Sequence, residues 1–322
     1  MRANKLLHTN IGELELCLKS SWVWPYIEQL YKELEQRQIN FRPHIWVSDD
    51  WYSPDGVAGF AIPFYLLDKR LINLEKSIIG EAEGETPDWL MMLLRHETAH
   101  ALDNAYHLRK IKRRQKLFGL SSKKYPVSYS PRPYDKNYVQ HLESYYAQAH
   151  PDEDWAETFA VWLNPKSNWR KTYKDWACIK KLQLCDSIME EIKNKTPLCL
   201  KSTETSPFNK MNLTLEDYYE EKKRRLKLDK RKSFEQAFIN ETPFNTQGQI
   251  LKDKKRIRNL LCHSLNKKDY IIDKYIEDIL EICSRHKIKL KKNKSNKTIN
   301  VMELLVGSSD EYFKSGIHKV YM

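Results

Sequence analysis

The chain has 322 residues, of which 41% are hydrophobic and 30% are charged, so it is long enough and apolar enough to bury a core. It contains no run of about eighteen apolar residues, which argues against a membrane span, and Glu13, Glu15 and Lys19 interrupt the first apolar stretch, which argues against a signal peptide. The six cysteines include no Cys-x-x-Cys pair, which argues against a zinc ribbon or a small disulfide scaffold. We therefore expect a cytoplasmic protein with reduced cysteines.

The formal net charge of +12 is distributed unevenly along the chain. Residues 201–322 hold 27 Lys and Arg against 17 Asp and Glu, so the C-terminal third carries most of the excess. Residues 201–210 have the composition of a linker, and the lysine-rich sequence after them has helical spacing. We predict one domain over residues 1–200 and a basic, helical C-terminal region over residues 201–322.

The first regular elements fall within the first seventy or so residues. Residues 21–40 carry apolar side chains at helical spacing, whereas 41–50 and 56–67 have the composition of strands. Pro63 places the second strand at a sheet edge, because proline has no N–H to give to a neighbouring strand. We therefore predict a small mixed sheet within residues 41–67, whose edge is open to an extended peptide.

Two helices are predicted from their start signals. Thr86, Pro87 and Asp88 combine a capping hydroxyl, a first-turn proline and an acid that complements the helix dipole, which predicts a helix over about 87–110. The sequence His-Pro-Asp-Glu-Asp likewise predicts the start of a second helix over 151–163. With the small sheet, these helices indicate an α+β fold.

The most informative pattern is the pentapeptide that begins at His96 and ends at His100. Histidines at positions i and i+4 project from one face of a helix, so both imidazoles can reach one zinc ion. Glu97 lies beside the first histidine, where it can act as general base on a water molecule. The pattern predicts a hydrolytic zinc site.

A hydrolytic zinc site needs a third protein ligand and one open position. The extended motif with a third histidine is absent, because Tyr106 stands at its place. Glu153 and Glu157 remain as candidates, since they lie one turn apart on the second helix. From the residues alone, both qualify.

Three stretches resemble the bacterial putative zinc-binding metallopeptidases, a gluzincin-like family. They are DDWYSPDGVAGFAIPFYLL, LLRHETAHALDNAYHL and YYAQAHPDEDWAETFAVWL. The resemblance covers about residues 40–180 well and the C-terminal third only loosely. Its combination of HExxH with HPxEDWAETFA is specific, and it implies a zincin-like domain that binds Zn²⁺.

Similarity to other gluzincins implies roles for four more residues. In thermolysin-like members the ligand glutamate is followed, four residues later, by a carboxylate that bonds a ligand histidine, which implies Glu153 as ligand and Glu157 as its supporting acid. In lethal-factor-like and Pro-Pro endopeptidases the motif continues as HExxHxxD, and a tyrosine lies seven residues before the ligand glutamate. These positions correspond to Asp103 and Tyr146. The similarity implies that Asp103 is an acid that supports the metal site and that Tyr146 is a catalytic residue that donates its hydroxyl to the developing oxyanion. The second spacing favours Glu153 over Glu157.

The expected function is hydrolysis of peptide or amide bonds in a peptide or protein substrate, with the proline- and tyrosine-rich loop 125–138 over the cleft. The alternative is a nucleic-acid or acidic-partner binding protein that uses the basic runs Glu221–Lys232, Lys252–Arg258 and Lys287–Lys297. Acids interrupt these runs and aromatics are few, which favours a solvated helix face instead. The sequence predicts neither the substrate's identity nor the oligomeric state.

Overall fold

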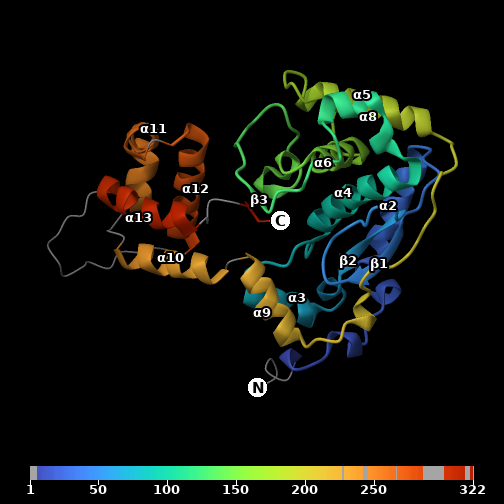
Figure 1. Cartoon of the computed structure of the whole chain (residues 1–322), viewed down its shortest axis with the longest axis horizontal. Coiled ribbons are helices and arrows are strands. Elements are labelled where there is room, and N and C mark those ends of the chain that lie inside the picture. The colour runs from blue at the N-terminus through green and yellow to red at the C-terminus, as the bar shows by residue number, and fades with distance from the viewer. Residues whose placement is uncertain are drawn as a thin grey trace. The chain divides into compact units, whose positions relative to one another are not determined.

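The computed structural model describes residues 6–226, 228–241, 246–265, 267–285, 301–315 and 320–321 (Figure 1). The chain forms two compact units: unit 1 comprises Met1–Pro126 and Asp135–Lys222, and unit 2 comprises Val127–Tyr134 and Lys223–Met322. Residues 201–222 pack in unit 1, although the sequence analysis assigns them to the C-terminal region. No helix in the described residues combines the length and the apolar character needed to cross a membrane.

Unit 1 consists of helices around one parallel pair of strands. The strands are β1 (His44–Ser48) and β2 (Gly59–Pro63). Its α-helices are α2 (Trp24–Gln36), α3 (Lys69–Ile79), α4 (Pro87–Tyr106), α5 (Lys112–Phe118), α6 (Pro151–Leu163), α7 (Trp169–Thr172) and α8 (Ile179–Ile192), together with most of α9 (Leu215–Leu226), whose last four residues fall in unit 2. Its 3-10 turns are η1 (Ile11–Glu13), η2 (Leu18–Ser20), η3 (Phe64–Leu67), η4 (Leu108–Lys110), η5 (Glu143–Gln148) and η6 (Phe208–Lys210).

Unit 2 is a second helical body with its own core. Its described elements are α10 (Leu228–Glu241), α11 (Thr246–Leu265), α12 (Asp269–Arg285), α13 (Val301–Ser315) and the antiparallel pair β3 (Ser128–Tyr129) and β4 (Val320–Tyr321). The core includes Phe234, Phe238, Leu261, Tyr275 and Tyr312, which come from all four helices. The predicted helical character of the C-terminal region is therefore confirmed for its described residues.

The second strand of unit 1, β2, does not form the open sheet edge that the sequence predicts. β1 and β2 pair in parallel, and the other side of β2 is engaged because the Ala61 N–H donates to the Tyr52 carbonyl at 2.8 Å. All five residues of β2 are buried. The predicted pairing of a substrate peptide with this strand would have to displace the Tyr52 bridge, so β2 is not an open edge.

Helix α4 is the central element of unit 1, and its residues are buried from Leu93 onward. Its start is as predicted, since the Trp89 N–H donates to the Thr86 hydroxyl and Pro87 opens the first turn. Its end comes earlier than the predicted residue 110. His107 adopts a left-handed conformation with φ of 55° and caps the helix after Tyr106.

Helix α6 lies beside α4 and buries every residue from Asp152 to Leu163 (Figure 1). The predicted start is confirmed, because the His150 ring accepts a hydrogen bond from the Asp152 N–H and Pro151 occupies the first turn. Trp155 and Phe159 anchor the helix in the core. Since its acids are also buried, each of them requires a partner.

Helix α9 is fixed to α3 by a buried ion pair. Lys222, part of the basic run that the sequence analysis placed on a solvated face, is only 8% exposed and its Nζ lies 2.6 Å from Glu75 Oε1. Its ammonium also lies 5.0 Å from the ring centroid of Tyr65 and 3.2 Å from the Tyr218 hydroxyl. The Lys222 charge therefore serves the fold rather than an acidic partner.

We predict that Lys222→Met lowers the free energy of unfolding of unit 1 by about 3–5 kcal/mol, because it leaves the Glu75 carboxylate buried without its counter-charge. All nine tryptophans lie in unit 1, so urea unfolding followed by tryptophan fluorescence reports on this unit. Exposed Lys166→Met is the control and should change stability by less than about 0.5 kcal/mol. Equal stability of the two variants would contradict the role of this pair.

Candidate metal centre

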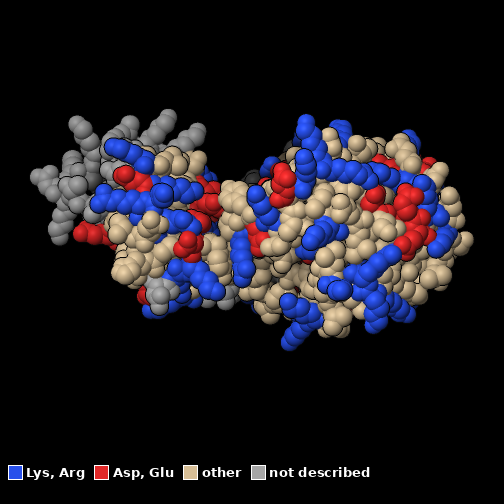
Figure 2. Space-filling model, turned by 90° about the horizontal axis from the view of Figure 1, so that it is seen from above, with Lys and Arg blue, Asp and Glu red and all other residues tan. Residues whose placement is uncertain are grey.

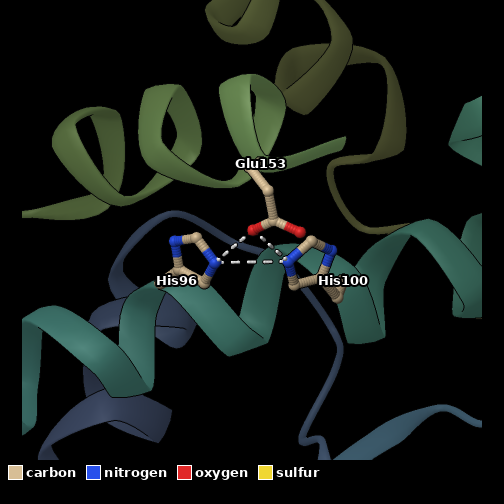
Figure 3. A group of neighbouring side chains, drawn as sticks. All are labelled: His96, His100 and Glu153. Atoms are coloured by element: carbon tan, nitrogen blue, oxygen red, sulfur yellow. Dashed lines mark hydrogen bonds and ion pairs between the residues drawn. The ribbon is translucent and has the colours of Figure 1, made fainter. Parts of the chain in front are cut away.

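Two histidines of α4 and one glutamate of α6 converge on one point (Figure 3). His96 Nε2 lies 3.3 Å from His100 Nε2, and Glu153 Oε2 lies 3.0 Å and 3.4 Å from these two nitrogens. The i, i+4 spacing on α4 and the position of Glu153 in the first turn of α6 bring the three side chains together. All three are less than 10% exposed.

The triangle of donor atoms has the size that zinc requires. Ligand atoms about 2.0–2.1 Å from a tetrahedral zinc ion lie about 3.3 Å from one another, which matches the three observed distances. Two imidazole nitrogens and one carboxylate oxygen are also ligands that zinc prefers. The residues therefore fit a zinc ion that retains one open position.

Glu157 contacts the His96 ring at Nδ1, the nitrogen that is not part of the triangle. Its Oε1 lies 2.8 Å from His96 Nδ1, and its Oε2 accepts a hydrogen bond from the Leu142 N–H at 2.8 Å. A carboxylate oxygen can accept the proton of Nδ1, which would leave the Nε2 lone pair of His96 for a metal ion bound beside Glu153. The structure thus gives the two glutamates different positions, with Glu153 at the triangle and Glu157 on the far side of the ring.

The electrostatics of the triangle favour a cation. Burial opposes a charge on His96, but the carboxylates of Glu153 and Glu157 outweigh it and raise the pKa of the ring well above its ordinary value. Burial likewise opposes the charge on Glu153, yet His100 and His96 hold its pKa well below the usual range. The buried site therefore attracts positive charge.

Glu97 lies between the two histidines in the sequence and is buried with 6% exposure. Burial raises the pKa of its carboxyl above the ordinary value, although His100 and His96 counteract this. Within the described part of the chain its Oε2 has no hydrogen-bond partner. A buried carboxylate oxygen without a partner beside a metal triangle can accept a proton from a bound water molecule.

Tyr146 lies against the first histidine, with its ring centroid 5.6 Å from that of His96. It follows Ser144 and Tyr145, which both adopt left-handed conformations, with φ of 57° and 55°. Such residues cost about 1–2 kcal/mol each and gather at functional sites, where the surrounding structure holds them. The predicted catalytic tyrosine thus lies at the metal centre, on a strained turn.

Asp103 is buried one turn beyond His100 but belongs to a different network. Its two oxygens accept hydrogen bonds from Arg114 at 2.8 Å and 2.7 Å, and Arg114 also lies 3.3 Å from Asp152 at the start of α6. Since Asp103 is on α4, Arg114 fastens the histidine helix to the glutamate helix. Asp103 is therefore linked through Arg114 to the start of α6.

Two residues at this site have no role in the sequence analysis. Tyr125, within the predicted cleft loop, donates a hydrogen bond to Glu153 Oε1 at 2.8 Å, and Arg114 joins α4 to α6. Neither falls at a diagnostic spacing from the HExxH motif, so only the folded chain brings them to the site.

Two further histidines lie outside the triangle. His107 is exposed at the end of α4, and the His141 ring bonds the Met92 carbonyl.

Comparisons with known proteins agree with this geometry. Residues 83–205 match the family model described as putative zinc-binding metallo-peptidase, and this range contains all the site residues named above. No curated protein and no solved structure gives a significant match. Residues 83–205 are therefore similar to the putative zinc-binding metallo-peptidase family, which is also the family that the motifs resemble.

Proposed function

We propose that the protein is a zinc-dependent peptidase of the gluzincin type with a zincin-like catalytic domain. The observation that carries the proposal is the triangle of His96, His100 and Glu153, whose edges match tetrahedral zinc coordination. Buried Glu97, whose Oε2 has no hydrogen-bond partner among the described residues, supports catalysis rather than a structural metal. In this proposal Zn²⁺ is the cofactor, and the substrate is a peptide or protein.

The roles of the protein groups follow from their positions. A zinc ion held by the triangle would supply Lewis acidity, which acidifies water and polarises a carbonyl. Glu97 would accept the proton of the attacking water and return it to the leaving amine. Tyr146, against His96, would donate its hydroxyl to the developing oxyanion. Glu157 would hold the His96 ring with Nε2 toward the site.

We prefer this proposal to binding of nucleic acid or another acidic partner. Lys222 is buried, and Arg258 is engaged by Asp269 at 2.8 Å and Asp273 at 2.9 Å. Figure 2 shows Lys and Arg interleaved with Asp and Glu over the face that it draws. The run Lys287–Lys297 lies outside the described residues. Lys222 and Arg258 are thus engaged by acids of the chain itself, which does not favour a polyanion site at these two residues.

Glu97→Gln should lower kcat by about 10²–10⁴, because the amide cannot accept a proton, while zinc affinity stays unchanged. Cleavage of a mixed peptide library, detected by mass spectrometry, gives the activity, and competition with a chromophoric chelator gives the affinity. Glu190→Gln, at an exposed position of α8, is the control. A fully active Glu97→Gln enzyme would exclude Glu97 as the base.

The two glutamates of α6 should differ in their effects on zinc binding. Glu153→Ala removes one of three ligands and should weaken zinc binding by more than about 100-fold, whereas Glu157→Gln alters only the partner of His96 and should cost about 10–100-fold. The same chelator competition measures both. If Glu157→Gln has the larger effect, the assignment of ligand and supporting acid is reversed.

Tyr146→Phe should lower kcat by about 10²–10³ with little change in zinc affinity, because it removes one donor to the oxyanion. Its neighbour Tyr145→Phe preserves the backbone and serves as the matched control. Steady-state kinetics on a peptide found in the library assay separates kcat from KM. Equal kcat values for the two variants would refute the role of Tyr146.

A further inference from the structure

Tyr125 contacts the second carboxylate oxygen of Glu153. Its hydroxyl donates to Glu153 Oε1 at 2.8 Å, whereas Oε2 is the oxygen that lies 3.0 Å from His96 and 3.4 Å from His100. A phenol is protonated at neutral pH, so it donates to a carboxylate. Oε2 of Glu153 therefore faces the two histidines, whereas Oε1 binds the Tyr125 hydroxyl.

The segment that carries Tyr125 is fastened to the first turn of α6. The Tyr125 ring stacks on His150 with a centroid distance of 3.7 Å and an interplanar angle of 17°. The same His150 ring lies 2.7 Å from the Lys123 carbonyl, and Ser121 donates to Asp152 at 2.6 Å. Three contacts thus hold residues 121–125 against the helix that supplies Glu153.

The hydrogen bond from Tyr125 affects how many oxygens of Glu153 can bind a metal ion. A free carboxylate can bind a metal through one or both oxygens, and the second mode would take up the open position that hydrolysis needs. Because the Tyr125 hydroxyl already binds Oε1, it opposes binding of the metal through both oxygens of Glu153.

We propose that Tyr125 is a positioning residue that holds Glu153 as a one-oxygen ligand and so keeps a coordination position open. The inference rests on the proposed zinc site, because it assigns Tyr125 a task only if Glu153 binds metal. Tyr125 differs in this from Tyr146, which lies against His96 and is assigned to the oxyanion.

The test is Tyr125→Phe, which retains the stacking on His150 and removes only the hydroxyl. We expect the zinc dissociation constant to rise by about 10–100-fold in chelator competition. We also expect the visible absorption of the Co²⁺-substituted variant to differ from that of the wild type, because the coordination of the metal changes. Tyr26→Phe, a ring that packs on Trp22, is the control and should alter neither value.

The outcomes separate this inference from the proposed function. If the wild type binds zinc and Tyr125→Phe matches it in affinity and cobalt spectrum, the role of Tyr125 is wrong and the zinc site stands. If the wild type binds no metal, both fail. A crystal structure of the zinc-loaded wild type is an independent check: one oxygen of Glu153 on the metal supports the inference, and two oppose it.

Discussion

The constraint on which the site depends is the close approach of three buried electron-pair donors. Two imidazole nitrogens and a carboxylate oxygen lie 3.0–3.4 Å from one another, away from bulk solvent. Without positive charge between them, such atoms repel one another, and burial would make their approach costly. Placing a divalent cation at their centre turns the repulsion into coordination. We interpret the packing of α4 against α6 as the scaffold that holds these donors in place.

Buried ion pairs hold α4 in place against its neighbours α2 and α6. Arg95, next to the first histidine, makes a bidentate ion pair with Glu33 of α2, at 2.7 Å and 2.8 Å. Arg114 joins Asp103 of α4 to Asp152 of α6, and Glu157 fixes the His96 ring. These charges are buried and paired, so losing one partner would leave the other uncompensated. The same ion pairs thus contribute to the fold and to the geometry of the metal centre.

Sequence reasoning anticipated the parts of this structure that depend on local rules. Helix caps follow from residue type, so the starts of α4 and α6 were predictable, and the helical period brought His96 and His100 to one face. The residues alone left Glu153 and Glu157 as candidates for the third ligand, and similarity to gluzincins favoured Glu153.

Features that depend on tertiary packing were not predictable in this way. His107 ends α4 early by adopting a left-handed conformation, and Lys222 lies in a basic run yet is buried against Glu75. The contacts of Tyr125 and Arg114 join segments about 28 and 38 residues apart, with no periodic pattern to indicate them. The parallel β1 and β2 pair, bridged by Tyr52, also replaced the expected open edge.

The most direct test of the account is the metal content of the intact chain. After incubation with excess Zn²⁺ and removal of unbound metal by gel filtration, elemental analysis should find about one zinc per chain, and a Glu153→Ala variant treated in the same way should retain much less. A chain that retains no zinc under these conditions would contradict the account.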